Sequence, residues 1–168
     1  LIAVIFSLLA IGIYIAIRFK TWQWAMGGVI ALFHDAFLTI GVFSLLHGVL
    51  PFTLDVDQSF IAAILTIIGY SINDKVVIFD RIREYRTLYP KRDIKRNINE
   101  AINSTLARTV NTTGTTVVVL LAIFIFGGEV IRGFVFALMF GIIIGALSSV
   151  FVATPIAYDM MRKKGIEN

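Results

Sequence analysis

Residues 69–84, GYSINDKVVIFDRIRE, place charged side chains inside an apolar run that is long enough to help cross a bilayer. Ser71, Asn73, Asp74 and Lys75 interrupt its apolar residues. A central Asp or Lys costs a membrane helix about 2.5–3.5 kcal/mol on insertion scales, and such residues usually face a bundle interior or a water-filled path. Asp74 is therefore the leading candidate functional residue, and the segments around it decide what lies beside it.

The composition indicates a membrane protein. Of the 168 residues, 58% are hydrophobic and only 15% are charged, and the mean hydropathy is +0.87. The absence of cysteine excludes a disulfide framework and a cysteine-based metal or redox site. The chain has no phosphate-binding loop, zinc motif, nucleophilic triad or intramembrane-protease motif. We therefore expect neither an enzyme nor a cofactor, and no nucleic-acid partner.

Apolar segments separated by polar connections predict five membrane spans, since about 20 apolar residues cross a bilayer. The connection after the second segment carries Pro51, Asp55 and Asp57, which suit a turn and a helix start. Gly127 and Gly128 end the fourth segment. The chain opens at Leu1 inside an apolar run, without an initiator Met or a charged region ahead of it, so we expect a fragment rather than a signal peptide. The predicted spans are about 1–17, 22–46, 59–79, 105–126 and 130–158.

The segment at about 81–103 is charged and polar. Pro90 is a helix breaker, and Asp93 is a candidate N-cap. Apolar residues then recur at helical spacing, at Ile94, Ile98, Ala101 and Ile102. This pattern predicts an amphipathic helix on the membrane surface. The expected fold is all-α: a polytopic transmembrane helix bundle with five spans and a cytoplasmic amphipathic helix, forming one domain over residues 1–168.

The distribution of basic residues predicts the orientation. Twelve of the fifteen Lys and Arg residues fall in the connections and tail on one side of the predicted spans, at 18–20, 81–96 and 162–164. Arg132 is alone on the other side, and Lys75 and Arg108 lie within spans. Because basic loops remain in the cytoplasm, we expect the N-terminal end outside and the C-terminus inside.

Arg108 is the predicted partner of Asp74. At 1.5 Å per residue, Asp74 lies about 10 Å inward from Arg81 at the cytoplasmic interface. The fourth span enters from the same side, so Arg108 reaches a similar depth. An arginine stabilises an ionised carboxylate, whereas burial favours the protonated form, so a changing distance would couple proton transfer to motion. We predict a proton relay of Asp74 and Arg108, supported by polar residues at Ser71, Asn73, Lys75, Asn111, Thr112, Thr115, Thr116, His34 and Asp35.

Other interpretations of these residues remain open. The pair is also compatible with a static ion pair that sets helix register, or with an Arg108 side chain extended to the cytoplasmic surface. Lys75 lies about 100° around the helix from Asp74, so it is either a local neutraliser or another extended side chain. His34 and Asp35 fit a relay, because histidine titrates near neutrality, or a polar pair bonded to neighbouring helices. Gly141, Gly145 and Ser149 form a small-residue ridge that favours close helix packing.

The motifs resemble those of the SecF family, the smaller half of SecDF protein-export complexes. The resemblance rests on residues 69–74 and 76–84, His34-Asp35, Arg108-Thr109, the threonines at 112–116, and Phe126 with the two following glycines. It covers essentially the whole chain. The chain departs from the family pattern in two respects. The family's first span and extracytoplasmic domain are expected to be absent from it, and Lys75 stands where a small hydroxyl residue is expected.

The resemblance implies a permease half of the resistance-nodulation-division type in the bacterial cytoplasmic (inner) membrane. Such a subunit works with SecD, separate or fused, beside the SecYEG channel and YajC, and acts on exported unfolded polypeptide. Proton flow, or Na+ in its place, is expected to drive export, with Asp74 and Arg108 matching the family's membrane aspartate and arginine. A proton-coupled exporter of lipids or drugs and a non-conducting translocon scaffold are the alternatives.

Overall fold

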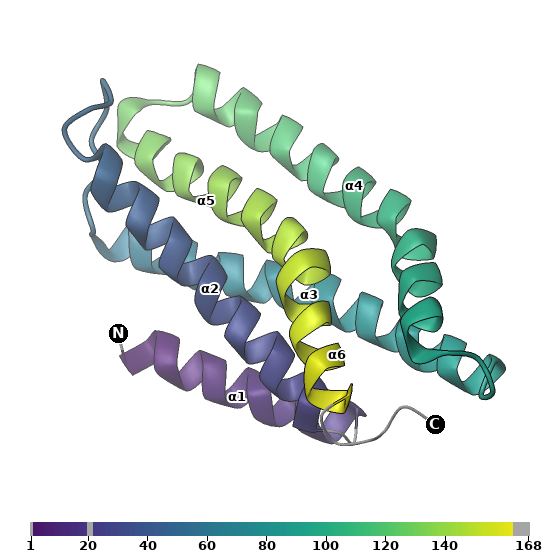
Figure 1. Cartoon of the computed structure of the whole chain (residues 1–168). Coiled ribbons are helices and arrows are strands. Elements are labelled where there is room, and N and C mark those ends of the chain that lie inside the picture. Colours follow the sequence, from purple (N-terminus) through teal and green to yellow (C-terminus); the bar gives the residue numbers. More distant parts are fainter. Residues whose placement is uncertain (1, 20–21, 163–168) are drawn as a thin grey trace.

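A computed structural model describes residues 2–19 and 22–162, and every regular element among them is helical (Figure 1). The long helices run side by side as an elongated bundle, which confirms the all-α prediction. In chain order the helices are α1 (Ile2–Phe19), α2 (Trp22–Leu46), α3 (Gln58–Leu88), α4 (Ile94–Phe126), α5 (Glu129–Ser148), the π-helical η1 (Ser149–Ala153) and α6 (Thr154–Arg162).

Four helical stretches are long and apolar enough to cross a membrane: Trp22–Leu46, Gln58–Leu88, Ile94–Phe126 and Glu129–Arg162. The last of these runs through α5, η1 and α6, so a π-helical turn interrupts the expected fifth span. The apolar stretch of α1 is shorter, at Ile5–Phe19. A crossing by α1 therefore remains a prediction, whereas the other four expected spans each correspond to one of these stretches.

The end of the bundle near the C-terminus gathers the basic connections. The end of α1, the start of α2, the α3–α4 turn and the end of α6 all lie there (Figure 1). Arg18 of α1 and Asp80 of α3 form an ion pair of 3.0 Å at this end, and Arg81 pairs with Glu84 at 2.7 Å. Ion pairs therefore connect the charged residues of this part of α3 to α1 and to each other.

The structure corrects the prediction of a separate surface helix. Helix α3 continues to Leu88, and residues 94–103 are the first turns of α4 rather than an independent element. Ile94, Ile98 and Ala101 are buried within this chain. Their helical spacing was interpreted correctly, but the apolar face that they form packs against protein, because α4 bends over the end of the bundle (Figure 1).

Local signals set the helix ends close to where the sequence predicts. The Asp57 carboxylate accepts a 2.8 Å hydrogen bond from the Phe60 amide at the start of α3. Asp93 accepts from the Lys95 amide at the start of α4. Gly127 follows α4 and allows a close turn, since a β-carbon there would lie 2.3 Å from the Ile123 carbonyl oxygen.

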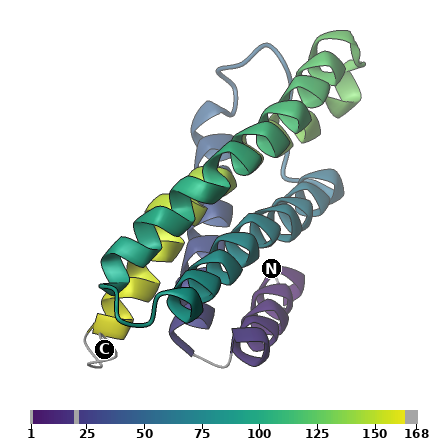
Figure 2. The same ribbon diagram turned by 90° about the vertical axis from the view of Figure 1, so that its right-hand side faces the viewer.

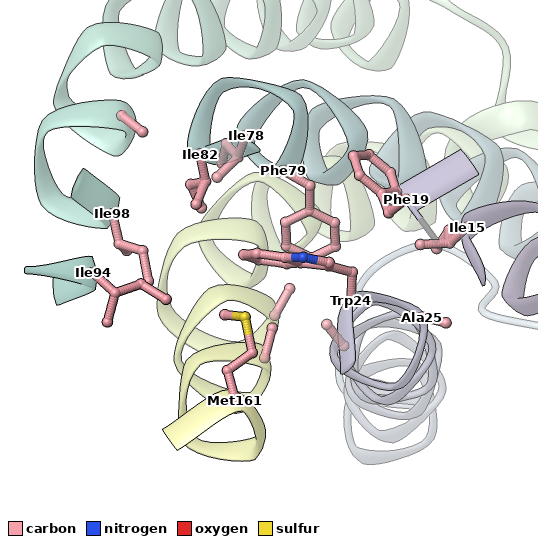
Figure 3. Close-up of a cluster of buried hydrophobic side chains, with 14 residues drawn as sticks. Ile15, Phe19, Trp24, Ala25, Ile78, Phe79, Ile82, Ile94, Ile98 and Met161 are labelled. Carbon is pink, nitrogen blue, oxygen red and sulfur yellow. The ribbon is translucent and has the colours of Figure 1, made fainter. Parts of the chain in front are cut away.

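Two apolar clusters form the core. One lies at the basic end, where Trp24 packs on Phe79 with ring centroids 4.6 Å apart and Met161 lies nearby (Figure 3). The other lies toward the opposite end and joins α2, α3 and α5 around Phe43, Phe60 and Ile67. Helices α2 and α3 each contribute buried residues to both clusters. Figure 2 shows that α4 instead lies along the outside of the bundle.

The predicted small-residue ridge of α5 packs against α3. A β-carbon on Gly141 would lie 2.3 Å from the Ile67 side chain, and one on Gly145 would lie 2.7 Å from Ser71 Oγ. Glycine at these two positions lets the helices approach closely, in the manner of small-residue interfaces in membranes. The close approach also brings Ser71 against α5, at the middle of the bundle.

Gly145→Ala should lower the free energy of unfolding by about 1–3 kcal/mol, because the added methyl group overpacks the α3–α5 contact. The matched control is Gly41→Ala on α2, where a β-carbon meets nothing within 4 Å. There the higher helix propensity of alanine should leave stability unchanged or increase it by up to about 1 kcal/mol. Chemical unfolding of the purified protein in detergent compares the two; equal effects would contradict the close-packing argument.

Candidate functional site

A buried ion pair joins α2 to α3 in the middle of the bundle. Lys75 Nζ lies 2.9 Å from Asp35 Oδ2, and both side chains are fully buried. Asp35 is in the second span and Lys75 in the third, so the pair ties together segments 40 residues apart in the chain. The partner of Lys75 is therefore Asp35. This contact excludes the interpretation in which the Lys75 side chain extends to the membrane interface.

Two serine hydroxyl groups complete the surroundings of this pair. The Lys75 ammonium also donates to Ser71 Oγ and, at 3.0 Å, to Ser148 Oγ on α5. Ser71 in turn donates to Asp35 Oδ2 at 2.7 Å, and Ser148 donates to the Gly145 carbonyl oxygen. An ammonium has three N–H donors, and each has an acceptor here. The group is thus hydrogen-bonded as fully as its chemistry allows.

These four residues form a polar layer between the two apolar clusters. On α3, the layer residues Ser71 and Lys75 lie between Ile68 of one cluster and Ile78 of the other. His34 lies at the edge of the layer, with Nδ1 3.3 Å from Asp35 Oδ1 and a side chain that is 39% exposed. His34 and Asp35 thus form a polar pair, and Asp35 is bonded to α3 through Ser71 and Lys75.

Asp74 is next to this layer but takes no part in it. Its side chain is buried, with 3% exposure, and its Oδ2 atom has no hydrogen-bond partner. Among the described residues only Asn97 Oδ1 and Thr113 Oγ1 share that condition. Burying an unpaired carboxylate is costly. Among the described carboxyl groups, Asp74 is therefore the one that protonation or a new hydrogen-bond partner would stabilise most.

Arg108 lies within electrostatic reach of Asp74, but the two side chains form neither a hydrogen bond nor an ion pair within 4.0 Å in this conformation. The sequence predicted that the face of α4 with Arg108 would turn toward Asp74. Instead, Thr105 and Thr109 are the buried residues of this part of α4, and the expected face is exposed within this chain. The exposed residues of that face are Arg108, Asn111, Thr112 and Thr115.

The threonine hydroxyl groups mostly bond to their own helix. Thr112, Thr115 and Thr116 each donate to a carbonyl oxygen one turn earlier. Tyr70 links α3 to this part of α4, since its hydroxyl donates to the Thr112 carbonyl oxygen at 3.1 Å and lies 3.1 Å from Thr116 Oγ1. Asn73 is exposed. The predicted lining is thus divided between a buried layer and an exposed face.

Sequence reasoning missed Ser148, Thr109 and Tyr70 as parts of the site. Ser148 follows Gly145 by three residues on α5, which places it on the same helix face. Thr105, Thr109 and Thr113 recur at i, i+4 spacing and mark the side of α4 that meets the bundle. No local signal indicated that the Tyr70 hydroxyl would reach α4, because that contact depends on how the two helices pack. Within the described residues no group of three or more His, Cys, Asp or Glu side chains is placed to hold a metal ion.

Apolar helices of spanning length, one basic end and buried charges within the spans define a multi-pass membrane protein with an intramembrane polar site. Residues 1–163 match the family model described as "Protein export membrane protein SecD/SecF, C-terminal". The chain belongs to the SecD/SecF family of protein-export membrane proteins.

Individual relatives agree with this assignment. The protein translocase subunit SecF of Rhodothermus marinus is 55% identical over 92% of this chain and 50% of its own length. That of Rickettsia rickettsii is 48% identical over 96% of this chain and 50% of its own length. The chain therefore spans about half the length of these relatives. A crystal structure of SecDF in a "Super-membrane-facing form" superposes with a TM-score of 0.82 and 39% identity, covering 95% of this chain and 21% of that one.

Lys75→Met should lower the free energy of unfolding by about 3–5 kcal/mol, because it leaves Asp35 buried without a counter-charge. The double variant Asp35→Asn/Lys75→Met should recover at least about 2 kcal/mol of this loss, since no uncompensated charge remains and Asn still accepts from Ser71. A double-mutant cycle of chemical unfolding in detergent measures the coupling.

The exposed pair Arg18–Asp80 is the matched control for that cycle, with side chains 43% and 39% exposed. Its coupling free energy should stay below about 1 kcal/mol, because solvent screens it. Equal coupling free energies in the two pairs would refute the claim that burial makes the Asp35–Lys75 pair more important for stability than an exposed pair.

Proposed function

We propose that this chain is the membrane-embedded part of a Sec-type export subunit that uses proton flow to assist translocation of unfolded polypeptide. Its relatives are named protein translocase subunit SecF, and its structural neighbour is a SecDF. The observation that carries the proton coupling is Asp74, a buried carboxyl group in a spanning helix whose Oδ2 has no hydrogen-bond partner.

The chemistry of Asp74 suits a proton carrier. Without a close counter-charge, a buried carboxyl group favours its protonated form, and an approaching guanidinium favours the ionised form. Arg108 is near enough to act on Asp74 but is not bonded to it. A relative movement of α3 and α4 that closes this distance would release the proton, and the reverse movement would take one up. Proton transfer is then tied to helix motion.

The exposed polar face of α4 supports a partner within the membrane. Arg108 and Asn111 lie in a membrane-spanning stretch and are exposed within this chain, although charged residues avoid lipid. We propose that a SecD half, separate or fused, covers this face. In the same proposal the complex lies beside SecYEG and YajC in the bacterial cytoplasmic membrane, with the basic end and the C-terminus in the cytoplasm. The coupling ion is the proton rather than Na+.

Asp74→Asn should abolish the part of export that depends on a proton gradient, because the amide cannot exchange a proton at this position. The complete protein is reconstituted with its translocon in vesicles, and polypeptide export is measured with and without an imposed gradient. The matched control is Asp80→Asn, which removes a carboxylate from the same helix at the partly exposed Arg18 pair. Asp80→Asn should keep the response to the gradient.

Retention of gradient-dependent export in Asp74→Asn would reject the relay and favour a translocon scaffold. Loss of lipid or drug transport in that variant, together with no association with SecYEG, would favour the alternative exporter. The two outcomes are distinguished by a co-purification assay and by a transport assay with labelled lipid or drug.

A further inference from the structure

The oxygen atoms of the buried layer around Lys75 are of the kind that coordinate a cation. Three oxygen atoms from three helices surround the ammonium: Asp35 Oδ2 of α2, Ser71 Oγ of α3 and Ser148 Oγ of α5. Carboxylate and neutral oxygen atoms are the ligands that hard cations prefer. All four residues are at most 2% exposed. The charge also balances, since one carboxylate neutralises one positive charge.

We propose that Lys75 is a tethered cation that occupies this site in place of a free monovalent ion such as Na+. The ammonium is delivered by α3 itself, so it cannot dissociate during a transport cycle. Asp35 is then permanently neutralised as an ion pair and neither exchanges protons nor binds free Na+. The site is an internal counter-ion rather than a coupling-ion site.

Close helix packing supports this assignment. The α3–α5 contact at Gly145 brings Ser71 against α5, and the adjacent Ser148 completes the coordination of the ammonium. Ser148 immediately precedes the π-helical turn η1, where Thr154 Oγ1 donates to the Ser149 carbonyl oxygen at 2.9 Å. Local π-helical turns often mark functional positions in helices. Here the turn follows the residue that completes the oxygen site.

The charged groups around the layer define what else acts on it. His34 of α2 contacts Asp35 Oδ1. Asp74 of α3 exerts an electrostatic influence on Lys75, and Arg108 of α4 acts on Asp74. On α5 the layer residue is the uncharged Ser148. Among the described residues the buried acidic side chains are Asp35 and Asp74. The consequence, which rests on the proposed function, is that Asp74 alone among them is available to carry the coupled proton.

The test replaces Lys75 with alanine and then adds free Na+ or K+ to the solution. The complete protein, the Lys75→Ala variant and the Asp35→Asn/Lys75→Ala variant are purified in detergent. Thermal unfolding is followed while choline is replaced by Na+ or K+ at constant ionic strength. Lys75→Met is the matched control, because its side chain fills the space of lysine without carrying charge.

The wild type should show no specific response to Na+ or K+. Lys75→Ala should unfold at a lower temperature in choline and recover at least ~5 °C with Na+ in a saturable manner, as expected when an ion binds only the folded state. Lys75→Met and Asp35→Asn/Lys75→Ala should show no recovery. A saturable Na+ response of the wild type, or no response of folded Lys75→Ala to either ion, would overturn the proposal.

A second measurement does not depend on the stability of Lys75→Ala. Infrared difference spectra of the wild type against Asp35→Asn/Lys75→Met isolate the Asp35 carboxyl band. In the wild type this band should be that of an ionised carboxylate, and it should not shift when Na+ is added. A band of a protonated carboxyl group, or a shift with Na+, would overturn the proposal. Because neither measurement involves export, the outcome is independent of the Asp74 relay.

Discussion

The ion pair between Lys75 and Asp35 is the constraint around which this bundle is arranged. Both groups are fully buried and lie 2.9 Å apart, and an unpaired charge in their position would cost several kcal/mol. The pair is tolerated because the hydroxyl groups of Ser71 and Ser148 occupy the remaining donors of the ammonium. Meeting that requirement fixes the rotation of α3 against both α2 and α5.

Fixing α3 also determines where Asp74 points. Since Asp74 and Lys75 are consecutive, they lie about 100° apart around the helix axis, and the orientation of one sets that of the other. With Lys75 held toward Asp35, Asp74 lies outside the polar layer, within reach of Arg108 but not bonded to it. One buried charge is thus fully satisfied and static, while its neighbour is left without a partner. This contrast is the physical basis for assigning the two residues different roles.

The outer position of α4 leaves some of its polar residues exposed within this chain. Its membrane-spanning stretch has few residues buried within this chain, and Figure 2 shows it along the outside of the bundle. Arg108 and Asn111 therefore lie on a polar surface that is exposed within this chain. Because charged residues in a membrane-spanning stretch avoid lipid, this surface is the basis of the proposal that a further protein segment covers it.

The sequence by itself determined the helical class, the approximate position of the long helices and the residues with intramembrane charge. Apolar runs, helix-breaking residues and caps such as Asp57 act over a few residues, so they can be interpreted without a fold. The resemblance in residues 69–84 also indicated the family. Tertiary structure alone decided which charges pair. Asp35 and Lys75 are 40 residues apart, and helical periodicity describes the faces of one helix but not its rotation against another. That rotation depends on close contacts such as the one at Gly145, which is why Lys75 rather than Asp74 obtained the buried partner.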